Sequence, residues 1–258
     1  MLKGLLKLSW IETKIFLREP MGVVGSLVLP VLLFVFVGRA LRLSPRGVEN
    51  PMVRLPFNIA ILTALLISLG AVQSLVAIMA IYREGGILKR LRATPLSPVA
   101  ILGAHVLVKL TFTLAAMVVM ILAGRRVLPG AMPANGASFV VAVLIGTTSI
   151  LSLGFVMASL VRSARFAQAL GAALTYVMLA LSGVFFSVER FPRWLQLVAN
   201  ALPTTHAVTL MRAIWSGAAW ATQLPTVAAL AMIFAVCIGF SSRWFRWTSW
   251  WTTPSRSI

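Results

Sequence analysis

Long apolar runs alternate with short polar segments along the whole chain. A helix needs about 20 apolar residues to cross about 30 Å of hydrocarbon, because it rises about 1.5 Å per residue. Runs that meet or approach this length predict six transmembrane helices, at residues 21–38, 55–82, 99–124, 134–161, 166–188 and 224–242. The pattern therefore predicts an all-α polytopic membrane protein, with residues 1–258 forming a single transmembrane domain. An even number of spans puts both termini on one side of the membrane.

Residues 1–20 have a helical pattern of another kind. Basic and apolar residues occupy different faces of a helical wheel, and the basic ones lie within roughly 60° of one another. The basic face holds Lys3, Lys7, Lys14 and Arg18, and the apolar residues mostly opposite are Leu5, Leu8, Ile15 and Phe16. This division predicts an interfacial helix that lies along the membrane surface.

Residues 83–98 form a charged island between the second and third predicted spans. In a helix, one face of this segment combines a single carboxylate with apolar side chains, namely Glu84, Ile87, Leu88 and Leu91. Pro95 disfavours helical geometry at Thr94, so the helix must be short. A short amphipathic helix of this kind is suited to docking into a groove on a water-soluble partner.

The order of residues in this island resembles the signature between the second and third membrane helices of ABC-2 type permeases. These permeases are the membrane subunits of a class of ATP-driven exporters, and their signature segment is a coupling helix that contacts the ATPase. The resemblance implies an ATPase-coupling role for Arg83, Glu84, Gly86, Leu88, Arg90, Leu91 and Pro95. Two positions depart from the pattern: Ile87 replaces the usual threonine, and Lys89 replaces the usual acidic residue. The alternative is a solvated basic loop.

Residues 189–216, between the fifth and sixth predicted spans, contain Pro192 and Pro203. These prolines divide the segment into helical pieces that are too short to span a membrane. Its order of features is similar to the extracellular re-entrant segment of the same family. We therefore hypothesise that an extracellular gate closes the outer end of the pathway and is formed by Phe185, Phe186, Trp194, Leu202 and Pro203.

Two ionisable residues interrupt otherwise apolar surfaces. Glu12 lies on the apolar side of the N-terminal helix, where it is either a satisfied polar residue near the water boundary or a contact with the ATPase or the coupling segment. Lys109 lies inside the third predicted span. A bare lysine at the membrane midplane costs about 3 kcal/mol, so we expect Lys109 to extend toward the nearer interface. The alternative is a position on the substrate path.

Composition excludes several other classes of protein. The chain is 60% hydrophobic and only 11% charged, with a mean hydropathy of +0.96, which is too apolar for an ordinary soluble domain. Its 23 Lys and Arg against 5 acidic residues give a net charge of +18. The basic residues lie between apolar runs, which fits membrane lipids and an acidic partner surface better than nucleic acid.

Motifs for catalysis and metal binding are absent from the sequence. No lysine is followed by Ser or Thr, so the chain lacks a phosphate-binding P-loop, and it has neither a His-Glu-x-x-His nor a Gly-x-Ser-x-Gly motif. Its one cysteine, Cys237, excludes an internal disulfide. We therefore expect no catalytic residue, no metal site and no cofactor on this chain, and the resemblance implies that ATP and Mg bind to the partner ATPase.

The resemblance implies a permease subunit that forms half of a substrate pathway in the cytoplasmic membrane, with both termini in the cytoplasm. The expected partners are a separate ATP-binding cassette ATPase, a second permease subunit in a homodimer or heterodimer, and membrane lipids. The exported substrate would be a drug, lipid, polysaccharide or peptide. Two alternatives stay open, a secondary transporter driven by an ion gradient and a membrane scaffold that tethers an ATPase.

Overall fold

The computed structural model of the protein describes residues 2–18, 23–43, 55–85, 98–127, 133, 135–160 and 163–244. Every regular element within these ranges is helical, which confirms the all-α prediction. The α-helices are α1 (Leu2–Arg18), α3 (Leu29–Leu43), α4 (Leu55–Glu84), α6 (Pro98–Val127), α7 (Gly136–Leu160), α8 (Ala164–Leu181), α9 (Arg193–Ala201), α10 (Pro203–Trp215) and α11 (Leu224–Trp244). Short π or 3-10 helices are η1 (Val24–Val28), η4 (Val188–Arg190) and η5 (Trp220–Gln223).

Four helices of the described residues are long and apolar enough to cross a membrane. Their apolar spans are Ala60–Tyr82 in α4, Gly103–Arg126 in α6, Gly136–Met157 in α7 and Trp220–Ser241, which includes most of α11. These helices coincide with the second, third, fourth and sixth predicted spans. The chain is thus a multi-pass membrane protein, and the full arrangement of six spans remains a prediction.

The first and fifth predicted spans differ most from the helices observed. The first corresponds to η1 followed by α3, so π-helical geometry interrupts the region before the regular helix. The fifth was expected to continue to residue 188, but α8 ends at Leu181. Gly183 adopts φ 81°, a left-handed conformation that ends helices and that glycine adopts without strain.

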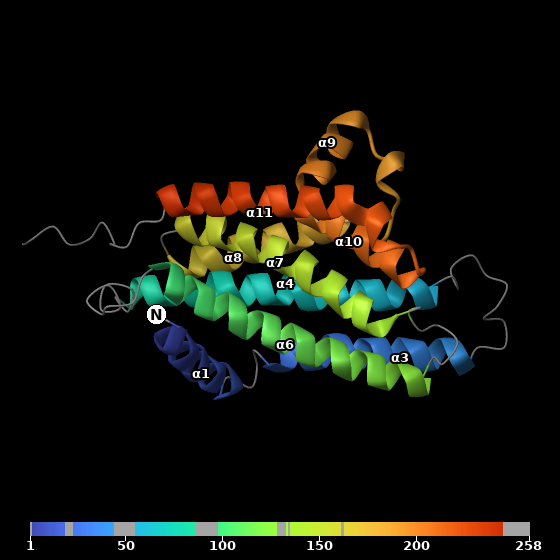
Figure 1. Ribbon diagram of the computed structural model, residues 1–258, viewed down its shortest axis with the longest axis horizontal. Helices are drawn as coiled ribbons and strands as arrows, with labels where there is room; N and C mark the ends of the chain where they lie inside the picture. Colours follow the sequence, from blue (N-terminus) through green and yellow to red (C-terminus); the bar gives the residue numbers. More distant parts are fainter. Residues whose placement is uncertain are drawn as a thin grey trace, which may run out of the picture.

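The long helices run side by side along the longest axis of the molecule (Figure 1). The helix α4 lies in the interior and packs against α7 and α8, while α7 also packs against α10 and α11. The amphipathic helix α1 packs against α6 at the end of the bundle where α4 ends and α6 begins. The short helix α9 projects from the bundle near the end where α11 begins.

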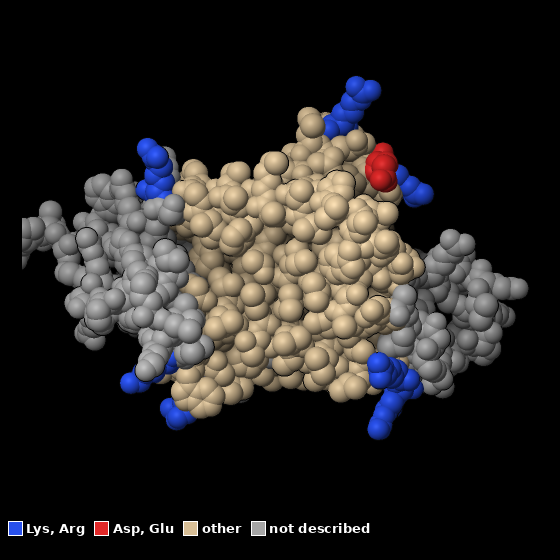
Figure 2. All heavy atoms as spheres, viewed as in Figure 1, with Lys and Arg blue, Asp and Glu red and all other residues tan. Residues whose placement is uncertain are grey.

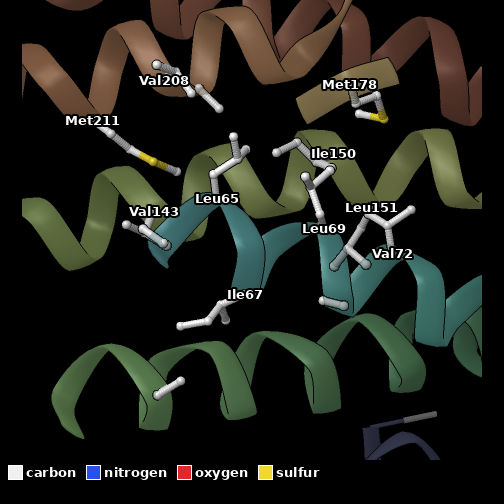
Figure 3. Close-up of a cluster of buried hydrophobic side chains, with 14 of the residues drawn as sticks. Leu65, Ile67, Leu69, Val72, Val143, Ile150, Leu151, Met178, Val208 and Met211 are labelled. Atoms are coloured by element: carbon white, nitrogen blue, oxygen red, sulfur yellow. The ribbon is translucent and has the colours of Figure 1, made fainter. Parts of the chain in front are cut away.

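Close packing between α4, α7 and α10 forms the centre of the core. Leu65, Leu69 and Val72 of α4 lie against the α7 face that carries Ile150 and Leu151 (Figure 3). Two α7 glycines allow this approach. A Cβ atom on Gly146 would lie 2.9 Å from the Ala207 Cβ of α10, and one on Gly154 would lie 3.2 Å from a Leu75 methyl group of α4. Small residues that permit close helix contact are typical of helical membrane proteins.

Hydroxyl groups also bind α7 to its neighbours. Ser68 of α4 and Thr147 of α7 are hydrogen-bonded at 2.8 Å. Ser149 of α7 donates to the Leu230 carbonyl of α11 at 2.9 Å, and Ser241 of α11 donates to the Phe155 carbonyl of α7 at 3.3 Å. Because few competing partners exist in hydrocarbon, such bonds help to fix the relative positions of helices.

The charged side chains of the described residues avoid the middle of the molecule on the face shown in Figure 2. Lys and Arg side chains lie at the two ends of the bundle and around α9, and a wide uncharged band separates them. This distribution is the one expected for helices whose central parts are surrounded by hydrocarbon.

Candidate functional site

The predicted coupling segment joins neighbouring ends of two long helices. The helix α4 continues through Arg83 and Glu84, and Pro98 begins α6. Proline is favoured at the first position of a helix because its missing N–H is not needed there. The other predicted coupling residues, Gly86, Leu88, Arg90, Leu91 and Pro95, lie outside the described residues.

Glu84 has a different environment from the one predicted. We expected a partly buried carboxylate on the apolar face of a separate helix, but Glu84 belongs to the last turn of α4 and its side chain is exposed. The carbonyl groups at a helix C-terminus carry partial negative charge, so a carboxylate there does not stabilise the helix. A surface contact therefore explains Glu84 better than a buried charge pair within the chain.

A buried polar cluster connects α1 with the ends of α4 and α6, and we call it the Glu12 cluster. It comprises Glu12, Ser74, Tyr82, His105 and Lys109. The Tyr82 hydroxyl donates a hydrogen bond of 2.7 Å to Glu12 Oε1. His105 Nδ1 lies 3.6 Å from Glu12 Oε2, and the Tyr82 and His105 rings meet edge to face with their centroids 5.5 Å apart.

Lys109 completes the cluster and is only 4% exposed. Its ammonium group donates a hydrogen bond of 2.6 Å to Ser74 Oγ and lies 4.1 Å from the centroid of the Phe16 ring. The expectation that Lys109 extends to the interface is wrong for this structure, because its side chain is held between α1 and α4. A cavity of about 10 Å³ adjoins it, which is close to the minimum for one water molecule and too small for a substrate.

Helical spacing explains how these residues meet. Glu12 and Phe16 are four residues apart on α1, as are His105 and Lys109 on α6, so each pair shares one helix face. Ser74 and Tyr82 share a face of α4 in the same way. Burial raises the pKa of the Glu12 carboxyl, whereas the Tyr82 hydrogen bond and the charge of Lys109 act in the opposite direction and favour the carboxylate.

Of the two possibilities for Glu12, the structure shows a satisfied polar residue, because its carboxylate accepts the Tyr82 hydrogen bond and lies beside His105. Neither partner belongs to residues 83–98, so a contact with the coupling segment or the ATPase stays a prediction. Sequence reasoning did not find Tyr82 or His105. One signal was available: two ionisable groups spaced i, i+4 in an apolar span require a buried partner, and the chain has only 5 acidic residues to supply one.

The predicted gate residues divide into two groups at the end of the bundle where α9 projects. Phe185, Phe186 and Trp194 are 54%, 63% and 66% exposed. Leu202 is half-buried against the core, and the buried Pro203 begins α10. The first group thus presents apolar surface, whereas the second supports the fold of this region. We call the region from Ser182 to Trp215 the outer cap.

Polar side chains fix the backbone of the outer cap. Arg212 of α10 donates to the Gly183 carbonyl at 2.6 Å and to the Val184 carbonyl at 3.3 Å, just after α8 ends. Thr205 donates to the Ala199 carbonyl of α9 at 2.6 Å, and the Gln196 amide donates to the Phe191 carbonyl at 2.8 Å. These bonds satisfy carbonyl groups where helices end, so the short helices hold a defined position.

The described part of the chain holds no group of three or more His, Cys, Asp or Glu side chains that could bind a metal ion.

Comparison with protein families finds a match to the model described as ABC-2 type transporter over residues 4–215. No match was found among curated proteins. The range matched by the family model extends from α1 to the end of α10 and includes the coupling segment, the Glu12 cluster and the outer cap. The chain therefore belongs to the ABC-2 type transporter family, as its membrane-spanning component.

Proposed function

We propose that the protein is the permease subunit of an ATP-driven exporter and provides half of the substrate pathway. A separate ATPase subunit, which binds ATP and Mg, contacts residues 83–98, and a second permease subunit completes the pathway. The protein lies in the cytoplasmic membrane with both termini in the cytoplasm. The substrate is a drug, lipid, polysaccharide or peptide.

The observation that carries this proposal is the arrangement of α4 and α6. The end of α4 and the beginning of α6 lie next to α1, so the segment that resembles a coupling helix is anchored on two long helices. The apolar spans of both helices cross most of the bundle. A movement of residues 83–98 by the ATPase would therefore displace α4 and α6, whose helices extend through the membrane.

The exposed apolar residues of the outer cap suggest how the pathway closes. Phe185, Phe186 and Trp194 follow a backbone held by Arg212 and Gln196. Large apolar side chains on a rigid support exclude water well, and a second subunit would cover surface that is exposed in one chain. We infer that these three residues close the outer end of the pathway between paired subunits and that Leu202 and Pro203 support them in the gate.

The Glu12 cluster gives the ion-gradient alternative some support, because it contains buried ionisable groups. Glu12, Tyr82 and His105 lie where α1, the end of α4 and the start of α6 meet, and Lys109 lies one helical turn further along α6, beside Ser74. An ion-driven carrier needs such groups along its pathway near the membrane midplane. The position at one end of the bundle favours a role in coupling.

Purification of the chain with its natural partners tests the proposal. The proposal expects an ATP-hydrolysing protein in equal stoichiometry with the permease. A scaffold would bind the ATPase, but adding candidate substrates would not change its ATP hydrolysis. A secondary transporter would move substrate after ATP depletion and stop when the proton gradient collapses.

A further inference from the structure

The Glu12 cluster lies where both ends of the coupling segment enter the bundle. Tyr82 lies just before Glu84 at the end of α4, and His105 lies within the early turns of α6. Glu12 contacts both residues from α1, through the 2.7 Å bond to Tyr82 and the 3.6 Å approach of His105. Any displacement of α4 relative to α6 at this end must therefore alter the surroundings of the Glu12 carboxylate.

We propose that the Glu12 cluster positions the coupling segment, by holding α1, the end of α4 and the start of α6 as one unit that transmits movement of the segment to α1. Glu12, Tyr82 and Lys109 are positioning residues in this account and do not touch the ATPase or the substrate. The proposal rests on the proposed function of residues 83–98 as the ATPase contact.

Charge is one reason why we expect the unit to hold together. Lys109 is buried, and within the cluster Ser74 supplies only a hydroxyl and Phe16 only the face of a ring. Glu12 is the one group of the cluster that can carry negative charge, and the charge of Lys109 favours its carboxylate form. A buried ion that loses its counter-charge is strongly destabilising, whereas replacement of both ions by neutral groups is often tolerated.

Removal of Glu12 and removal of Lys109 leave different partners for the charged group that remains. Glu12→Gln leaves the Lys109 ammonium without the negative charge of the cluster. Lys109→Met leaves the Glu12 carboxylate with the hydrogen bond from the Tyr82 hydroxyl. Loss of Glu12 should therefore release α1 more than loss of Lys109 does.

Amide hydrogen exchange of α1 measures this release directly, in the full chain reconstituted in lipid nanodiscs. Glu12→Gln should accelerate exchange of residues 2–18 by about tenfold or more, and Lys109→Met by less. The double variant Glu12→Gln with Lys109→Met should return close to the wild-type rate, because neither charge remains. The nanodiscs contain only neutral lipid, so the matched control Lys14→Gln removes an exposed charge of α1 that has no anionic headgroup to contact, and wild-type exchange is expected. The charge account would be overturned if the double variant accelerated exchange of residues 2–18 by a factor equal to or larger than the product of the two single-variant factors.

Coupling is measured as ATP hydrolysis by the assembled complex relative to hydrolysis by its free ATPase subunit. Tyr82→Phe removes one hydroxyl and keeps the ring, so it should change this ratio by about threefold or more without weakening ATPase association. A role in folding alone would leave the ratio unchanged. If Glu12→Gln fails to insert, Tyr82→Phe and Glu12→Asp still decide the question.

The two proposals fail in different ways. If no ATPase associates with the wild-type chain, the proposed function is wrong. If the wild-type complex forms and hydrolyses ATP, but the Glu12 and Tyr82 variants keep both its hydrolysis ratio and its α1 exchange, then only the positioning proposal is wrong.

Discussion

The Glu84 carboxylate lies in the last turn of α4, where helix carbonyl groups disfavour negative charge. We predict that Glu84→Ala stabilises the end of α4 slightly, by about 0.3–1 kcal/mol, because this repulsion is removed. The same substitution should weaken binding of the ATPase, by about 2–5 kcal/mol if the carboxylate becomes desolvated in the complex. Thermal unfolding of the permease and titration of the ATPase measure the two effects separately.

Lys89→Ala is the comparison for this experiment. We expect Lys89 to lie at the rim of the contact with the ATPase, so its substitution should weaken ATPase binding far less than Glu84→Ala does. The account of Glu84 would be contradicted if Lys89→Ala weakened binding more, or if Glu84→Ala retained full affinity.

Phe186 and Leu202 allow gating to be distinguished from packing. Phe186→Ala removes an exposed side chain, so the free energy of unfolding should stay within about 0.5 kcal/mol of wild type. Leu202→Ala should cost about 1–3 kcal/mol, because Leu202 packs against the core. The gate hypothesis expects higher basal ATP hydrolysis by the complex in both variants.

Leu197→Ala is the matched control for Phe186→Ala, because Leu197 is 73% exposed on α9 but is not one of the proposed gate residues. Unchanged basal hydrolysis in Phe186→Ala, or an equal increase in Leu197→Ala, would place the gate elsewhere.

At the level of elements, α7 is held at distances that leave no room for an added methyl group. Gly146→Ala would bring two Cβ atoms of α7 and α10 to 2.9 Å, so one helix must shift. We predict a loss of about 1–3 kcal/mol in the free energy of unfolding, typical of overpacking. Gly239→Ala on α11 is the control, since nothing lies within 4 Å of its added Cβ. Denaturation of both variants in the same detergent measures the difference in their free energies of unfolding. Equal values would contradict this prediction, because they would show that α10 shifts to accommodate the added methyl group without loss of stability.

Much of the element order could be predicted because apolar length alone identifies the spans of α4, α6, α7 and α11. The end of α8 could not, because only the backbone conformation shows that Gly183 terminates the helix. The hydrogen-bond partners that join one helix to another could not be predicted from the sequence either. Adjacent hydroxyls on α7 differ in their use, since Thr148 donates to its own helix and Ser149 donates across to α11.

The candidate site could be predicted in part. Motif order predicts a coupling segment at residues 83–98 and short helices divided by prolines at residues 189–216, and in the second segment Pro203 does begin α10. The Glu12 cluster depends on how α1 packs against α4 and α6, which periodicity within a single helix does not specify. For the same reason, Lys109 was expected at an interface and is instead held in the bundle by Ser74 and Phe16.

For the whole molecule, α1 presents a basic surface away from the bundle. Lys7, Lys14 and Arg18 are exposed, while Glu12 and Phe16 on the other side of the helix are buried. Each exposed cation near an anionic surface contributes about 1 kcal/mol to binding. We predict that α1 is cleaved more slowly by protease in anionic vesicles than in neutral ones, and that Lys7→Glu with Lys14→Glu removes this difference. Equal cleavage of the wild type in both lipids would indicate that this surface contacts the ATPase instead.

Both ends of the molecule have a distinct role in this account, and the long helices connect them. The Glu12 cluster lies at the end that includes α1, where α4 ends and α6 begins, and the outer cap lies toward the end where α11 begins (Figure 1). The central claim is that an ATPase acts on this chain through residues 83–98.

The most direct measurement of this claim is the amount of ATP-hydrolysing protein that purifies with the chain from its native membrane. It is compared for the wild type and for a variant in which Leu88 and Leu91 are both replaced by aspartate. The account predicts one ATPase subunit per wild-type chain, and loss of the ATPase from a variant that still inserts and keeps wild-type exchange of α1. An ATPase retained by that variant, or absent from the wild type, would contradict it.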